Sequence, residues 1–132
     1  MAKKTRAVKK TNTPPRAAST GPVAIVALGA SAGAVQGLRQ FLSHIDPETP
    51  VAYVITQHLD EHGNDLALEV LKSQSPLPVI RIESGTKLRS GHIFHAPAHS
   101  RVGVKNNSFV VENLTERNEA VTMIDFTFRS LA

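Results

Sequence analysis

The sequence of 132 residues contains no cysteine and no tryptophan. The absence of cysteine excludes disulfides, thiol catalysis and cysteine-based zinc sites, and it is compatible with a reducing compartment. No apolar run approaches the roughly 18 residues that a membrane helix needs. No apolar segment follows the charged N-terminus, as one would in a secretory signal. We therefore expect a cytoplasmic protein without a membrane span.

Acidic residues are absent from residues 1–20, which hold six lysines and arginines. Since the whole chain has 15 basic and 11 acidic residues, the remainder carries 15 − 6 = 9 basic against 11 acidic residues, a net charge of −2. We expect residues 1–21 to form a disordered basic tail and residues 22–132 to form a single domain. No aromatic residue accompanies the basic ones in the tail, so nucleic-acid binding, which would rest on phosphate contacts alone, is not the expected function.

The first half of the domain alternates between apolar runs and segments of helical periodicity. Continuous apolar runs predict buried strands at 23–28 and 51–56, and a shorter strand at 79–82. Apolar residues at helical spacing predict helices at 32–44 and 64–74. This β-α-β-α-β order favours a doubly wound α/β fold with a mostly parallel sheet and right-handed crossovers.

The second half does not continue this alternation of predicted strands and helices. Residues 91–95 form a short predicted strand, and Asn106-Asn107 between alternating apolar residues predicts an antiparallel hairpin. Thr122 and Asp125 resemble a capping box that opens a last helix. One face of that helix should carry the apolar side chains of Ile124, Phe128 and Leu131.

Residues 29–33 read Gly-Ala-Ser-Ala-Gly, a G-x-S-x-G pattern between a predicted strand and a predicted helix. Such a turn holds a serine outward at the carboxyl end of a strand, next to the free N–H groups of a helix N-terminus. Ser31 is therefore the candidate nucleophile. A phosphate- or dinucleotide-binding turn and a plain tight turn remain alternatives, although the chain has no G-x-G-x-x-G pattern and no acid closes the second strand.

His58 directly follows the second predicted strand. Because parallel strands end at the same edge of a sheet, Ser31 and His58 should converge, and His58 could act as the general base. The alternative is a surface loop histidine. The other histidines are scattered, and His92 and His95 should point to opposite faces of one strand, so neither a metal nor another cofactor is expected.

A catalytic triad also needs an acid that orients the histidine. Asp60, Asp65 and Asp125 are available in the sequence. Each has a simpler explanation. Asp60 fits a solvated loop position and Asp65 fits a helix cap, while Asp125 fits the first turn of a helix, where a carboxylate is stabilised. The residues alone therefore predict a Ser31–His58 dyad and no third member.

Three ordered motifs, at residues 26–33, 55–59 and 124–132, resemble the catalytic domain of the chemotaxis receptor protein-glutamate methylesterase, the CheB type. Residues 77–79, Gly85 and residues 91–97 match further landmarks, so the resemblance spans residues 23–132. The Gln-His-Leu-Asp-Glu-His stretch and the Ile-Asp-Phe ending are most similar to the form fused to a receptor methyltransferase.

This resemblance implies hydrolysis of methyl esters on glutamates of chemoreceptors by a Ser-His-Asp triad, with Ser31 as nucleophile and His58 as base. It implies methylated chemoreceptor cytoplasmic tails as partners, together with a methyltransferase domain or partner, and no cofactor. The family's acid lies in a later glycine-rich segment without a counterpart here. We therefore expect a C-terminally truncated domain, weak or inactive as this chain.

Several positions depart from the family pattern. Ala34 replaces the second glycine of a Gly-Gly pair, and the stretches 98–101 and 121–123 are altered. The tail is too short for a receiver domain, so phosphorylation control by that route is not expected. These departures support an alternative function, a non-catalytic signalling module that binds receptors.

Overall fold

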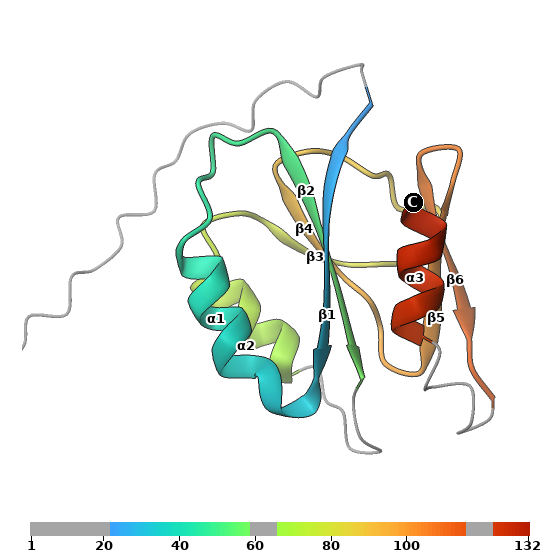
Figure 1. The fold of residues 1–132 in the computed structure, drawn as a ribbon, viewed down its shortest axis with the longest axis horizontal. Helices are drawn as coiled ribbons and strands as arrows, with labels where there is room; N and C mark the ends of the chain where they lie inside the picture. The colour runs from blue at the N-terminus through green and yellow to red at the C-terminus, as the bar shows by residue number, and fades with distance from the viewer. Residues whose placement is uncertain (1–21, 59–65, 116–122) are drawn as a thin grey trace, which may run out of the picture.

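The computed structural model describes residues 22–58, 66–115 and 123–132. Helices and strands alternate in the first half, and a hairpin and a last helix follow (Figure 1). The elements in chain order are β1 (Ala24–Ser31), the 3₁₀ turn η1 (Ala32–Ala34), α1 (Val35–Ser43), β2 (Val51–His58), α2 (Leu66–Gln74), β3 (Val79–Arg81), β4 (His92–His95), β5 (Ser100–Lys105), β6 (Ser108–Asn113) and α3 (Met123–Leu131).

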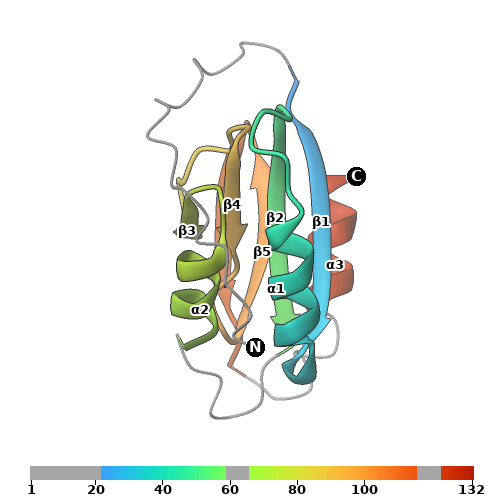
Figure 2. The same ribbon diagram turned by 90° about the vertical axis from the view of Figure 1, so that its left-hand side faces the viewer.

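The main sheet has four strands in the order β1-β2-β4-β3, and every neighbouring pair is parallel. Figure 2 shows this order, with α1 and α2 in front of the sheet. Strands β5 and β6 form a separate antiparallel pair. The predicted α/β fold with a mostly parallel sheet and an antiparallel hairpin is therefore confirmed.

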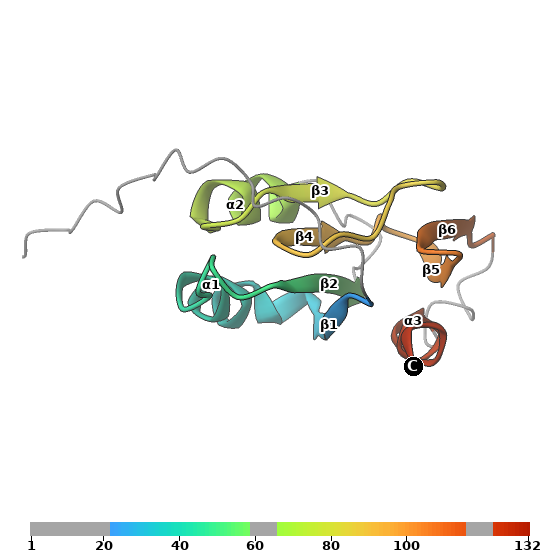
Figure 3. The same cartoon turned by 90° about the horizontal axis from the view of Figure 1, so that it is seen from above.

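The molecule is built in three layers (Figure 3). Helices α1 and α2 cover one face of the sheet, where Leu42 and Ile55 are fully buried. The β5–β6 hairpin and α3 cover the other face, where the rings of Phe94 and Phe109 lie 4.9 Å apart. The continuous apolar run of β2 serves both cores, because successive side chains of a strand point to opposite faces.

Strand β1 is longer than its apolar run predicts. It continues through Gly29 and Ala30 to Ser31, and these three residues pair with the last three residues of β2. Small side chains have weak strand propensity, so this pairing extends the strand beyond its sequence signal. The predicted helix at 32–44 accordingly starts as the 3₁₀ turn η1 before α1 begins.

The predicted hairpin turn is confirmed. Asn106 and Asn107 have φ values of 51° and 58°, the left-handed conformation that a two-residue turn between twisted strands requires. Lys105 and Ser108 form the last pair of the ladder beside this turn. Asparagine tolerates this conformation better than most residues, which explains why the pair marks the turn in the sequence.

The predicted last helix is confirmed as α3, and two of its predicted apolar residues, Ile124 and Phe128, lie next to Gly29 of β1. Met123 and Thr127 are the buried residues of α3, whereas Phe128 is 39% exposed. The helix lies against β5, and Ser130 Oγ accepts a hydrogen bond of 2.9 Å from the backbone N–H of Val104. Thr122, the first residue of the predicted capping box, lies outside the described residues.

The described helices are too short and too polar to cross a bilayer, and none of them qualifies as a membrane span.

Candidate functional site

The last residues of β1 and β2 lie opposite each other. In the parallel register between these strands, Ser31 is the Cα partner of His58. Both strands end there, at the carboxyl edge of the sheet, which is where sites form in open α/β folds. The backbone thus brings together the two residues that the sequence nominates, as the topology predicts. Their catalytic roles remain predictions.

Ser31 has an extended backbone, with φ −84° and ψ 169°, and it stands at the N-cap position of η1. Serine at such a position often bonds to the first N–H groups of the helix, but the Ser31 side chain makes no capping bond. The residue is exposed. Its hydroxyl is therefore available to solvent at the start of a helical segment whose N–H groups favour negative charge.

The two glycines of the G-x-S-x-G pattern have different environments. A Cβ atom on Gly29 would lie 2.6 Å from Cγ2 of Ile124 in α3, far inside contact distance. A Cβ atom on Gly33 would meet nothing within 4 Å. The first glycine is thus required for the close approach of α3 to β1, while the space around the second glycine would accept a side chain.

Next to the candidate pair lies a buried hydrogen bond. Gln57 precedes His58 in β2 and is 3% exposed, and His95 at the end of β4 is 5% exposed. Because the Gln57 Oε1 atom can only accept, the His95 ring donates through Nε2–H over 2.9 Å. In the sequence, His95 is one of several scattered histidines. A histidine inside a predicted buried strand was the signal that it needs a polar partner.

The candidate acids do not complete the site in the described part of the chain. Asp60 and Asp65 lie outside the described residues. Asp125 is exposed in the first turn of α3, where the positive end of the helix dipole stabilises its carboxylate. His92 bonds through Nδ1 to the carbonyl of Ser90 and stacks on Phe94. Among the residues described, no group of three or more potential ligands could hold a metal ion.

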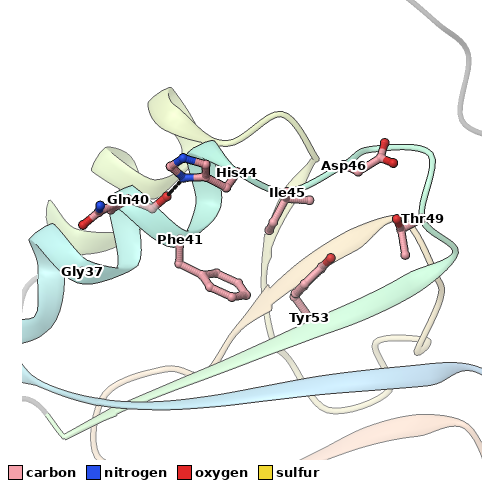
Figure 4. Close-up of a pocket in the computed structure, with 8 residues that line it drawn as sticks. All are labelled: Gly37, Gln40, Phe41, His44, Ile45, Asp46, Thr49 and Tyr53. Atoms are coloured by element: carbon pink, nitrogen blue, oxygen red, sulfur yellow. Dashed lines mark hydrogen bonds between the residues drawn. The ribbon is translucent and has the colours of Figure 1, made fainter.

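A pocket of about 670 Å³ lies elsewhere, between the end of α1 and the start of β2 (Figure 4). Phe41 and Tyr53 pack edge to face beneath it, with ring centroids 6.1 Å apart. Since β2 starts at this end of the sheet, the pocket lies at the edge opposite to Ser31. It belongs to no part of the candidate site. The lining residues are Gly37, Gln40, Phe41, His44, Ile45, Asp46, Thr49 and Tyr53.

A three-layer α/β domain with a serine and a histidine at the ends of adjacent parallel strands defines a class of candidate serine hydrolases. The comparison with family models is more specific, because the CheB methylesterase family matches residues 26–132. The chain belongs to this family.

Curated relatives support the assignment. The chain is 28% identical over 116 residues to a protein-glutamate methylesterase/protein-glutamine glutaminase of Desulfitobacterium hafniense (strain Y51), covering 84% of the chain and 30% of that protein. A similar protein of Nitrosomonas europaea is 29% identical over 112 residues, covering 82% of the chain and 31% of that protein. The chain thus spans about a third of the length of these relatives.

The fold also matches a solved structure. The CheB methylesterase catalytic domain of Thermotoga maritima superposes with a TM-score of 0.71 and 24% sequence identity. The match covers 83% of the chain and 60% of that domain. At this identity the likeness establishes the arrangement of helices and strands, not the chemistry.

Proposed function

We propose that this chain is the serine- and histidine-bearing part of a protein-glutamate methylesterase that acts in chemotaxis. Its substrates are methyl esters on glutamates of chemoreceptor cytoplasmic tails, so it works in the cytoplasm. Besides the receptor, its partner is a receptor methyltransferase, which is either a fused domain or a separate protein. Membership of the CheB methylesterase family supports this class of reaction.

The single observation that carries the proposal is the pairing of Ser31 with His58 at the carboxyl edge of the sheet. In the proposed reaction, the Ser31 hydroxyl attacks the ester carbonyl while His58 takes its proton. The proton then passes to the leaving methoxide, which departs as methanol and leaves an acyl-serine. Water, deprotonated by His58, attacks the acyl-serine; the bond to the Ser31 oxygen breaks, that oxygen takes the proton from His58, and the glutamate carboxylate is released.

The N–H groups that follow Ser31 are the proposed donors for the developing oxyanion. η1 begins directly after Ser31 and leads into α1, so unpaired helical N–H groups and the positive end of the helix dipole lie beside the serine. Neutral donors fixed at this position would stabilise the negative charge that develops on the ester oxygen.

We expect the 132-residue chain to be a weak enzyme by itself. The family's triad acid matches no residue here, and loss of an orienting acid costs about 10⁴ in rate in a well-studied protease triad. A histidine without that acid samples the wrong tautomer and orientation. Residual turnover would come from Ser31, His58 and the oxyanion donors.

The test is methanol release from a methylated chemoreceptor cytoplasmic fragment. We expect slow turnover by the unchanged chain and loss of that turnover in Ser31→Ala. Ser43→Ala is a matched control, because Ser43 is an exposed serine on α1 whose hydroxyl bonds, within the described residues, to the carbonyl of Gln40 and the ring of His44. Equal turnover in the unchanged chain and Ser31→Ala would remove the serine mechanism.

A non-catalytic receptor-binding module is the second candidate, favoured by the departures at Ala34, 98–101 and 121–123. Affinity capture with methylated and unmethylated receptor tails separates the two functions. Binding without any methanol release or covalent labelling of Ser31 by an organophosphorus reagent would support the module. Labelling that disappears in Ser31→Ala would support the enzyme.

A further inference from the structure

The end of β2 that carries His58 is supported unequally on its two sides. Toward β1, the backbone ladder runs to the last pair, Ser31 with His58. Toward β4, the last pair joins Ile55 to His95, and β2 continues for three residues beyond it, Thr56, Gln57 and His58. Among the described residues, the last backbone bond on that side runs from the N–H of Ala96 to the carbonyl of Ile55.

Side chains continue the connection where the backbone ladder stops. The His95 ring, at the end of β4, donates to Oε1 of Gln57 over 2.9 Å. Both residues are more than nine-tenths buried, so this bond is shielded from competing water. It fastens the residue directly before His58 to the neighbouring strand.

The bond from His95 determines the orientation of the Gln57 side-chain amide. Its Nε2 atom is buried and finds no hydrogen-bond acceptor in the described part of the chain. Burying a donor without an acceptor costs free energy. An amide that could rotate freely would therefore adopt another orientation. The bond from His95 therefore holds the side-chain oxygen of Gln57 at the end of β4.

We propose that His95 is a positioning residue that acts through Gln57 to fix the strand end carrying His58. The inference rests on the proposed function for its catalytic meaning, since His58 is the proposed base. The structural part, a fixed strand end, can be measured without any enzymatic activity. His95 itself touches neither the ester nor the serine in this scheme.

The first measurement is amide hydrogen exchange by NMR on the unchanged chain, His95→Leu and His95→Gln. We expect exchange at Gln57 and His58 to rise about tenfold in His95→Leu, because one buried hydrogen bond is lost. His95→Gln keeps an N–H donor of similar reach and should stay within about twofold of the unchanged chain. Exchange at Val54, in the middle of β2, should stay constant in both.

Two further variants keep the test decisive. His92→Leu changes a histidine of the same strand that bonds to Ser90 instead, and it should leave His58 unaffected. The double variant His95→Leu with Gln57→Leu replaces both polar partners by apolar ones, so it should fold even if a single variant does not. Faster exchange at His58 in this double variant supports the proposal. Exchange that rises no more at His58 than at Val54 overturns it.

Kinetics on the methyl ester then separate this proposal from the proposed function. Where the unchanged chain turns over, His95→Leu should lower kcat with little change in KM, and His95→Gln should restore it. Where the unchanged chain shows neither turnover nor labelling of Ser31, the proposed function fails, and the exchange data still decide whether His95 fixes the strand end. An unchanged kcat in His95→Leu would overturn the positioning role.

Discussion

Gly29→Ala should destabilise the protein although it adds only one methyl group. A Cβ atom at position 29 would stand 2.6 Å from Cγ2 of Ile124, while carbon atoms pack best at about 3.5–4.0 Å. Ile124 is β-branched and lies in a helix, so its χ1 angle has one strongly preferred value and cannot turn Cγ2 away. Relief therefore requires α3 to move outward by about 1 Å.

Such a movement is resisted at the other end of α3. Ser130 Oγ accepts a bond from the N–H of Val104, and a Cβ atom on Gly103 would lie 2.8 Å from the same oxygen. Overpacking of this kind costs about 1–3 kcal/mol. With a urea slope of about 2 kcal/mol/M, a loss of about 2 kcal/mol lowers the denaturation midpoint by about 1 M.

The assay is urea denaturation followed by circular dichroism, run as a double-mutant cycle. Ile124→Ala removes the clashing atom, so Gly29→Ala should cost less than about 0.5 kcal/mol in that background. Gly37→Ala is the control, because no atom lies within 4 Å of its new Cβ and alanine favours the helix by about 1 kcal/mol. An unchanged midpoint in Gly29→Ala, or the same loss in both backgrounds, would refute the packing of α3 on β1.

Two other perturbations test the second face of the sheet, again by urea denaturation. Phe109→Ala removes a buried ring that packs on Phe94, and it should cost about 3–5 kcal/mol; a cost below about 1 kcal/mol would mean that the hairpin does not cover the sheet. Asn107→Ala should be less stable than Asn107→Gly by about 1–2 kcal/mol, because only glycine accepts φ 58° freely. Both variants lose the bond from Asn107 to the Leu88 carbonyl, so their difference isolates the backbone conformation.

The sequence predicts the local elements of this fold well and their partners less well. The apolar run around Val54 identifies β2, and the two asparagines identify the hairpin turn, because these signals lie within a few residues. The place of β4 between β2 and β3 is a different matter. Four residues with a buried Ile93 and Phe94 predict a strand, but nothing in their periodicity names the neighbours.

The residues of the candidate site also differ in how well the sequence predicts them. Ser31 and His58 can be nominated from the sequence, since each follows a recognisable strand and parallel topology brings the strand ends together. The bond between Gln57 and His95 joins two strands that are distant in the chain, and no local pattern encodes it. The role of Gly29 likewise depends on Ile124, near the opposite end of the described chain.

The pairing of β1 with β2 also bears on the order of folding. These strands are joined by η1 and α1, so the loop that must close to bring Ser31 beside His58 is short and its entropic cost is small. Helix α3 packs on the same strands from a far more distant part of the chain. We expect the alignment of the two candidate residues to form early with this first crossover, and the later docking of α3 to govern how long it lasts.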